Sequence, residues 1–187
     1  MDKLPFTLIR KWIKPISADK LTEVIIENID WEQPTLKIYG KKHLVPRLTK
    51  FLGDSGIHYK YSGIEHIGKG WPGWFLPILK SVSDYCKVDY NGCLLNLYRN
   101  GDDCMGWHSD NEKELDHKKP ISSLSLGASR DFFLKNRSNS SKKETLILRN
   151  GDLLIMDPSC QSNWIHSIPR RKRNQELRLN LTFRKYI

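Results

Sequence analysis

The stretch ELRLNLTFR, residues 176–184, is the most informative part of this chain because its apolar and polar side chains alternate without a break. Successive side chains of a β-strand point to opposite faces, so the pattern predicts a strand with one apolar and one polar face. The apolar face would carry Leu177, Leu179, Leu181 and Phe183, and the polar face Arg178, Asn180, Thr182 and Arg184. An edge strand with a solvated polar face would give the same pattern.

The polar face of this strand has a second interpretation, in which it points into the protein. Two inward arginines are unfavourable unless an anion pairs with them. The backbones of Arg178 and Arg184 would stand ~20 Å apart, so their long side chains would leave a gap suited to a short dicarboxylate such as 2-oxoglutarate. Asn96 and Tyr98 share one face of CLLNLYR, residues 93–99, and would be further donors, unless they only pack in the core and its rim.

Other strand-like runs fill the second half of the chain, after two helix-like segments. The runs are CLLNLYR, ISSLSLG, DFFLK and TLILRNGDLLIM, and Asn150-Gly151 predicts a hairpin within the last. Residues 17–31 predict a helix capped by Ser17, and a second helix begins near Pro77. The apolar side of the second helix would carry Leu76, Leu79, Val82 and Tyr85. We therefore expect an α+β fold, an antiparallel jelly roll or barrel with helices packed on one side.

The composition limits the class of protein and of partner. A chain of 187 residues suits one domain. Lysine and arginine outnumber aspartate and glutamate by 31 to 21, a formal charge of +10, which favours a polyanionic partner. The four cysteines form no CxxC pair, and no apolar run is long enough for a signal peptide or a membrane span. We expect free thiols, no membrane partner and a reducing intracellular compartment, either the cytoplasm or a nucleus.

A metal site is indicated by the segment Trp107-His108-Ser109-Asp110. In an extended segment, His108 and Asp110 project to the same side and can meet one ion. His166 is the best third ligand, because a barrel can bring it opposite the first pair. Two histidines and one carboxylate leave coordination positions open, as in non-haem iron(II) sites. This spacing alone is common by chance, so the polar face of residues 176–184 is the independent support.

Together these residues resemble a known family. Asn96-Leu-Tyr98, His108-Ser-Asp110, His166 and the segment from Arg178 to Arg184 occur in the order and approximate spacing of the AlkB dioxygenases. The resemblance runs from about Pro46 to the C-terminus through PR, GD, YKYSG, SLSLGASRDF and NLTFRK, and it is strongest to the branch that repairs alkylated duplex DNA. The first 30 or so residues contribute little to it.

The resemblance implies a double-stranded β-helix core, Fe(II), 2-oxoglutarate and O2. One domain, residues 1–187, would comprise N-terminal helices and nucleotide-recognition hairpins in 1–90 and the catalytic jelly roll in 91–187. Iron would be held by His108, Asp110 and His166. Arg178 would pair with the distal carboxylate of 2-oxoglutarate, helped by Tyr98 and Thr182. Arg184 and Asn96 would serve the end nearest the metal, and Asn180 would lie in the same polar layer.

The resemblance also implies residues that contact the nucleic acid. Tyr59, Tyr61 and Ser62 would line the base pocket, with Tyr61 stacking on a flipped base opposite His108. Glu112 would contact the exocyclic amine of the base. The simpler alternatives are tyrosines on a hairpin face and a solvated loop carboxylate.

Phosphate contacts and a duplex-opening residue complete these expectations. The candidate phosphate contacts are Arg137, Lys142 and Lys143 in the polar loop NRSNSSKK, and Arg170, Arg171, Lys172 and Arg173 before the last strand. Such runs bind phosphate or simply form a soluble surface. Tyr39, followed by Gly40, matches the place of an aromatic wedge that enters the base stack, unless it packs on its own hairpin.

We therefore expect a monomeric DNA dealkylase acting on N1-methyladenine and N3-methylcytosine type lesions. The family's reaction splits oxygen, converts 2-oxoglutarate to succinate and CO2, hydroxylates the N-alkyl group and releases an aldehyde. Alternatives are an RNA or protein oxygenase of the same fold, because fold does not fix substrate, and a non-catalytic nucleic-acid-binding module. Intact ligands and both arginines favour the enzyme over the last.

Overall fold

A computed structural model describes residues 4–38, 40–61 and 64–187. Its helices are α1 (Pro15–Asn28), the short 3-10 helix η1 (Gly73–Phe75), α2 (Leu76–Cys86) and α3 (Pro158–Asn163). Its first strands are β1 (Phe6–Ile9), β2 (Thr35–Ile38), β3 (Lys41–Leu44), β4 (Leu48–Gly53), β5 (His58–Tyr61) and β6 (Ile64–Ile67). The others are β7 (Gly92–Tyr98), β8 (Met105–His108), β9 (Ile121–Gly127), β10 (Arg130–Asn136), β11 (Lys143–Leu148), β12 (Leu153–Met156), β13 (Trp164–Ile168) and β14 (Arg178–Arg184).

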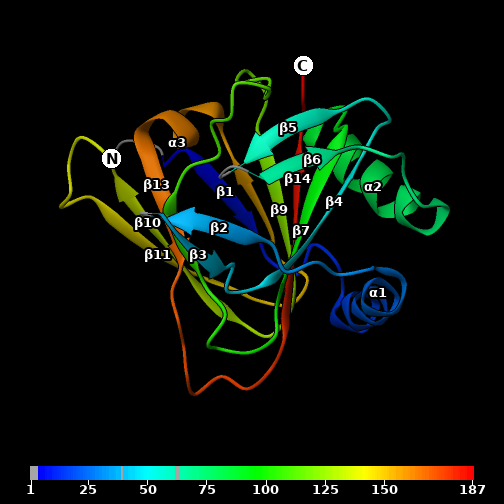
Figure 1. The fold of residues 1–187 in the computed structure, drawn as a ribbon, viewed down its shortest axis with the longest axis horizontal. Helices are drawn as coiled ribbons and strands as arrows, with labels where there is room; N and C mark the ends of the chain where they lie inside the picture. Colours follow the sequence, from blue (N-terminus) through cyan, green and yellow to red (C-terminus); the bar gives the residue numbers. More distant parts are fainter. Residues whose placement is uncertain (1–3, 39, 62–63) are drawn as a thin grey trace.

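These strands form two main antiparallel sheets and two separate hairpins (Figure 1). The large sheet has the order β1-β12-β9-β14-β7-β4, and the small sheet β11-β10-β13-β8. The hairpins β2–β3 and β5–β6 form two further two-stranded sheets of their own. The helices α1 and α2 lie on one side of the molecule, next to the large sheet. This is a double-stranded β-helix with helices on one side, which confirms the expected fold class.

The strand β14 lies in the middle of the large sheet, between β7 and β9. All seven of its residues are buried. Its apolar residues Leu179, Leu181 and Phe183 pack with residues of α1 and α2 such as Ile25 and Val82. The opposite face carries the arginines into the space between the two sheets. The alternative of a solvated edge strand is therefore wrong.

The large sheet takes strands from both ends of the chain. The strand β1, which we did not predict, pairs with β12, with Phe6 opposite Met156. At the other edge β4 pairs with β7, with Leu48 opposite Leu97. Segments before residue 91 thus share a sheet with the C-terminal strands.

The Asn150-Gly151 turn does not form the expected hairpin. The strands on either side, β11 and β12, belong to different sheets. Gly151 has a φ of +81° and lies so close to the backbone oxygen of Ile13 that a side chain would clash there. Asp152 accepts a hydrogen bond from the backbone N–H of Arg149, which closes the turn. The prediction of a tight turn is confirmed. The prediction of a hairpin is wrong, because a tight turn does not require the strands on either side of it to pair with each other.

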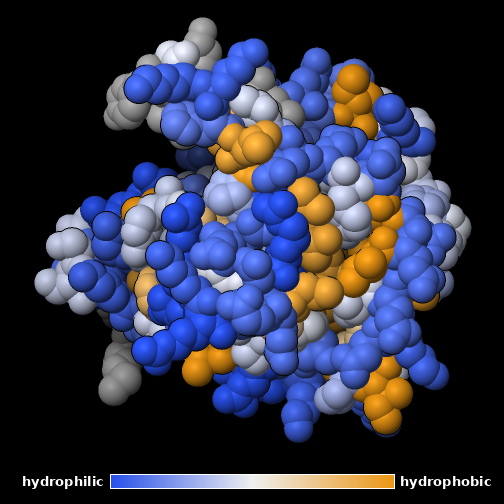
Figure 2. All heavy atoms as spheres, turned by 60° about the horizontal axis from the view of Figure 1, so that its bottom comes forward, coloured by the Kyte–Doolittle hydropathy of each residue, from blue (hydrophilic) through white to orange (hydrophobic). Residues whose placement is uncertain are grey.

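Both helices also differ from expectation in detail. The first begins at Pro15, with Lys14 rather than Ser17 as its N-cap; proline suits this position because its φ is already helical. In α2 the buried residues are Ile78 and Val82, whereas Leu76 and Tyr85 are largely exposed. No helix in the described ranges is long and apolar enough to cross a membrane. The face of the molecule seen in Figure 2 is mostly hydrophilic, with hydrophobic side chains in separate patches.

Candidate active site

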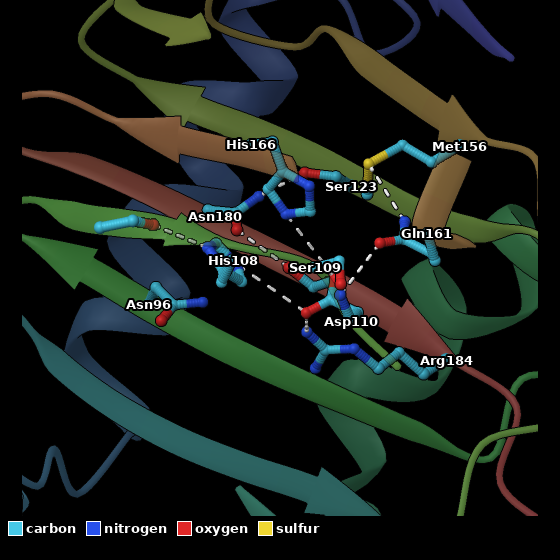
Figure 3. Close-up of polar contacts among 12 residues, drawn as sticks. Asn96, His108, Ser109, Asp110, Ser123, Met156, Gln161, His166, Asn180 and Arg184 are labelled. Atoms are coloured by element: carbon cyan, nitrogen blue, oxygen red, sulfur yellow. Dashed lines mark hydrogen bonds and ion pairs between the residues drawn. The ribbon is translucent and has the colours of Figure 1, made fainter. Parts of the chain in front are cut away.

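Two histidines and one aspartate meet between the two sheets (Figure 3). His108 ends β8 and lies opposite His166 of β13 in the pairing of the two strands. His108 Nε2 is 3.9 Å from Asp110 Oδ1, and His166 Nε2 is 4.0 Å from Asp110 Oδ2. One ligand atom from each residue lies within 4.8 Å of the others. This spacing and donor set fit a divalent iron ion held on one face, with the remaining positions open.

Neighbouring groups hold His108 and Asp110 in the orientation that a metal requires. His108 Nδ1 is 2.8 Å from the backbone oxygen of Gly106, which leaves Nε2 facing Asp110. Arg184 donates from Nη2 to Asp110 Oδ1 at 2.9 Å. The Asp110 backbone N–H donates to Gln161 Oε1 at 3.0 Å, from α3. Sequence reasoning missed Gln161, since a contact between side chain and backbone across 51 residues leaves no pattern in the sequence.

The protonation states of the three residues also suit a metal. Burial alone would raise the pKa of Asp110, but the charge of Arg184 and the two histidines lower it to about 2. Burial lowers the pKa of His166 to about 3, and the neighbouring His108 adds to this effect. Burial likewise lowers the pKa of His108. The site thus offers an ionised carboxylate and neutral imidazoles, the forms that bind metal ions.

One cavity contains this triad together with all six residues that the sequence assigned to 2-oxoglutarate. The six are Asn96, Tyr98, Arg178, Asn180, Thr182 and Arg184. Asn180 donates from Nδ2 to Ser123 Oγ at 2.7 Å, and Thr182 Oγ1 donates to Asn180 Oδ1 at 2.9 Å. Asn96 Oδ1 accepts a 2.6 Å hydrogen bond from Nε of the buried Arg47. Arg47 belongs to the PR motif, which was noted in the sequence without a role.

Arg178 lies in this cavity as a buried cation with few partners. Its side chain is 1% exposed, donates from Nη2 to Ser125 Oγ at 2.9 Å and lies 5.2 Å from the Tyr98 ring centre. Within the described ranges, its Nε and Nη1 have no hydrogen-bond partner. Burial lowers the pKa of Arg178 to about 10. A carboxylate would satisfy these donors, so the site fits one end of a dicarboxylate such as 2-oxoglutarate.

The residues expected to contact the base do not share one environment, and some of them lie outside the described residues. Tyr59 is 3% exposed and stacks on His66 with ring centres 4.7 Å apart, as in ordinary core packing. Glu112 has a buried Oε2 without a partner in the part of the chain described, and burial raises its pKa. Tyr39 and Ser62 fall outside the described residues, as does the side chain of Tyr61.

A second, larger cavity adjoins the metal site. It has a volume of about 310 Å³ and is mostly apolar. The β2–β3 region, β4, β6 and β8 contribute to its walls, and His108, His66 and Arg47 are among the lining residues. A space of this size beside His108 is large enough for a nucleobase.

The basic candidates lie at two different edges of the molecule, in the loop 137–142 with Lys143 at the start of β11, and in the loop 169–177 (Figure 1). In the first, Arg137 Nη2 donates to Ser109 Oγ at 2.5 Å and so reaches the His-Ser-Asp segment; Lys142 and Lys143 are exposed. In the second, Arg170, Lys172 and Arg173 are exposed. Arg171 differs, because it forms an ion pair with Asp131 at 2.5 Å.

Comparisons with known proteins agree with this geometry. The sequence model described as the 2OG-Fe(II) oxygenase superfamily matches residues 5–184. The chain is 36% identical to the mouse protein "DNA oxidative demethylase ALKBH2", over 91% of this chain and 75% of the mouse protein. It is 33% identical to the human protein of the same name, over 91% and 69%. Its fold is similar to "The structure of OsALKBH1", with a TM-score of 0.65, 17% identity and coverage of 100% of this chain and 99% of that one.

Proposed function

Because this chain belongs to the AlkB family of the 2OG-Fe(II) oxygenase superfamily, we propose that it is a DNA repair dioxygenase. Its substrates are DNA bases that carry small N-alkyl groups, of the N1-methyladenine and N3-methylcytosine type. The enzymes of this superfamily use Fe(II), 2-oxoglutarate and O2. The observation that carries the proposal is the triad of His108, Asp110 and His166 beside Arg178, two of whose guanidinium nitrogens have no hydrogen-bond partner among the described residues. The name of the mouse and human relatives supports DNA as the substrate.

Three residues hold the metal in this proposal, and six hold the cosubstrate. His108 Nε2, Asp110 and His166 Nε2 bind the iron, which, when bound, supplies the activation of O2 that oxidises the alkyl group while 2-oxoglutarate becomes succinate and CO2. Arg178 pairs with the distal carboxylate, aided by Tyr98 and Thr182. Arg184 and Asn96 serve the end nearest the metal, and Asn180 belongs to the same polar layer.

The chain's own contribution to the reaction is placement and exclusion of water. Arg184 keeps Asp110 ionised and oriented, and the hydrogen bond to Gly106 fixes the ring of His108. The two sheets bury both ends of the cosubstrate site, so the guanidinium of Arg178 meets its carboxylate in a dry environment. Contacts of this kind are stronger than in water.

On the substrate side, we propose that the base enters the apolar cavity beside His108. Tyr61 and Ser62 contact the base, and Tyr59 supports the pocket from behind by stacking on the lining residue His66. Glu112 reads the exocyclic amine. Tyr39 opens the duplex as a wedge. The backbone phosphates are bound by Arg137, Lys142, Lys143, Arg170, Arg171, Lys172 and Arg173, with Arg171 weakened in this role by its ion pair with Asp131.

We further propose that residues 1–187 act as one monomeric domain in a reducing intracellular compartment. The four cysteines carry free thiols, and Cys93 and Cys160 are buried. The partner is alkylated DNA, with RNA as an alternative to be tested.

The test is the mass of a methylated oligonucleotide after incubation with the protein, Fe(II) and 2-oxoglutarate. We expect loss of the methyl group from DNA together with succinate, and no loss with Asp110→Ala. Matched single-stranded DNA, duplex DNA and RNA should be compared. Succinate formation without demethylation of any of them would contradict a nucleic-acid substrate.

A further inference from the structure

On the outer face of the small sheet, two aromatic rings lie in a row between two cationic side chains. Lys135 Nζ lies 5.0 Å from the centre of the Trp107 ring. Trp107 and Phe133 are stacked, with centres 6.5 Å apart and planes 28° apart. Arg171 Cζ lies 5.3 Å from the centre of the Phe133 ring. We call these four residues the outer ladder.

The alternation of the strands places the outer ladder directly behind the metal site. His166 pairs with His108 on β8 and with Leu134 on β10, and these side chains face inward. Their neighbours Trp107, Ser167 and Phe133 therefore face outward. Ser167 is small, so the two rings can meet above it. The structure thus explains the contact between rings that belong to strands on either side of β13.

Trp107 is unusually exposed for a tryptophan. Its exposed fraction is 47%. It lies on the edge strand β8 and also lines the mostly apolar second cavity. A large aromatic side chain exposed beside a cavity is typical of a binding surface. Its position next to His108 means that a ligand on the outer ladder lies one residue away, along the strand, from a metal ligand.

The charge around the outer ladder selects the class of ligand. Lys135 lies directly opposite Lys143 in the pairing of β10 with β11, where two like charges repel each other unless an anion approaches. Arg137, two residues further on, is also exposed and reaches Ser109. The carboxylate of Asp131 forms an ion pair with Arg171 and offsets part of the positive charge at that end of the outer ladder. The whole chain carries +10.

We propose that the outer ladder binds an unpaired nucleobase of the nucleic-acid strand whose damaged base enters the active site. Aromatic rings stack on bases only where those bases are unpaired, while lysine and arginine bind the phosphates between them. A strand that crosses the β8 edge places one base on Trp107 while another reaches the cavity beside His108. The inference rests on the proposed function and assigns this enzyme a binding site for single-stranded nucleic acid next to the lesion.

The test uses labelled oligothymidylate, which is unmethylated and single-stranded, and a duplex of equal length. Fluorescence anisotropy without metal or 2-oxoglutarate gives the affinity of each. We expect Trp107→Ala to weaken single-strand binding by roughly 5- to 150-fold, the loss of one stacked base, and to change duplex binding less than twofold. Trp107→Phe should retain most of the affinity. Tyr85→Ala removes an aromatic residue of similar exposure (50%) from α2 and should leave both affinities unchanged.

A charge variant keeps the proposal testable if Trp107→Ala folds poorly. Lys135→Ala should lower the salt dependence of single-strand binding by roughly 0.7 in the log–log slope, with an unchanged thermal midpoint. Unchanged single-strand affinity in folded Trp107→Ala, or equal losses on single strand and duplex, would overturn the outer ladder as a stacking site. Demethylase activity of the unaltered protein is measured separately, so a failure of the proposed function is distinguishable from a failure of this site.

Discussion

Replacing Arg178 with methionine should stabilise the protein in the absence of 2-oxoglutarate and abolish the binding of that cosubstrate. The guanidinium is 1% exposed, and two of its nitrogens have no partner within the described ranges. Burial lowers the pKa of Arg178 from its usual 12.5 to about 10. A basic group whose pKa is lower in the folded than in the unfolded protein lowers the free energy of unfolding at every pH below its folded-state pKa. At neutral pH, Arg178 therefore destabilises the fold by the full amount.

The size of the effect follows from these contacts. The lowered pKa corresponds to about 3 kcal/mol against the charged form. Methionine has a similar length, and its introduction loses the hydrogen bond to Ser125, which contributes about 1 kcal/mol. The free energy of unfolding of the cosubstrate-free variant should therefore rise by about 2 kcal/mol. For a chain of this length, that raises the thermal midpoint by roughly 4–8 °C.

Thermal unfolding with Mn(II), in the presence and absence of 2-oxoglutarate, measures both effects. At a concentration of 100 times Kd, the cosubstrate should stabilise the unaltered protein by about 2.7 kcal/mol, and should not stabilise Arg178→Met. Arg130→Met is the matched control. Arg130 is 2% exposed but donates to the backbone oxygens of Asn100, Asp103 and Pro169, so its loss should lower the midpoint.

The opposite pattern would refute the reasoning. If Arg178→Met were destabilised as much as Arg130→Met, the guanidinium would be satisfied in the free protein. If the variant still gained stability from 2-oxoglutarate, the distal carboxylate would bind elsewhere.

Substitutions at four further positions test other parts of the site. Asp110→Ala should eliminate metal binding in calorimetry, since the triad has no spare ligand; retained affinity would remove Asp110 from the site. Gln161→Leu should weaken Mn(II) binding by roughly 10- to 100-fold, whereas Gln161→Glu, which keeps an acceptor for the Asp110 N–H, should lose less. Glu112→Gln should leave Mn(II) and 2-oxoglutarate affinities unchanged and lower kcat/KM on methylated oligonucleotides; an unchanged kcat/KM would exclude Glu112 from recognition of the base. Tyr39→Ala should slow repair of duplex more than of single-stranded DNA, and equal losses would exclude a wedge.

Local patterns in the sequence were enough to predict the elements closest to the chemistry. The alternation in residues 176–184 predicts β14, and the spacing of His108 and Asp110 places both side chains on one side of the chain. These predictions succeed because side-chain direction in a strand has a period of two and needs no information from other segments. The order of the motifs was likewise sufficient to predict the family.

Contacts between distant segments were not predictable in the same way. The pairing of β1 with β12 joins opposite ends of the chain, and Gln161 meets Asp110 through a backbone N–H. The outer ladder exists only because β13 places the small Ser167 between β8 and β10. Neither hydrophobic periodicity nor motif spacing reports such neighbours.

The sequence by itself determined the strand-rich fold class and the pairing of His108 with Asp110 on one side of the chain, because these follow from residue types and short spacings. His166 and the polar residues beside the metal site followed from the order of the family's motifs. Only the tertiary structure decided which sheet receives each strand after the Asn150-Gly151 turn, which face of α2 is buried and whether β14 is a central strand. The physical reason is that strand pairing and helix packing depend on the free edges and apolar surfaces offered by the rest of the molecule. The same dependence leaves Arg178 buried without a counter-ion among the described residues. Its position in an alternating pattern permits this property but does not require it.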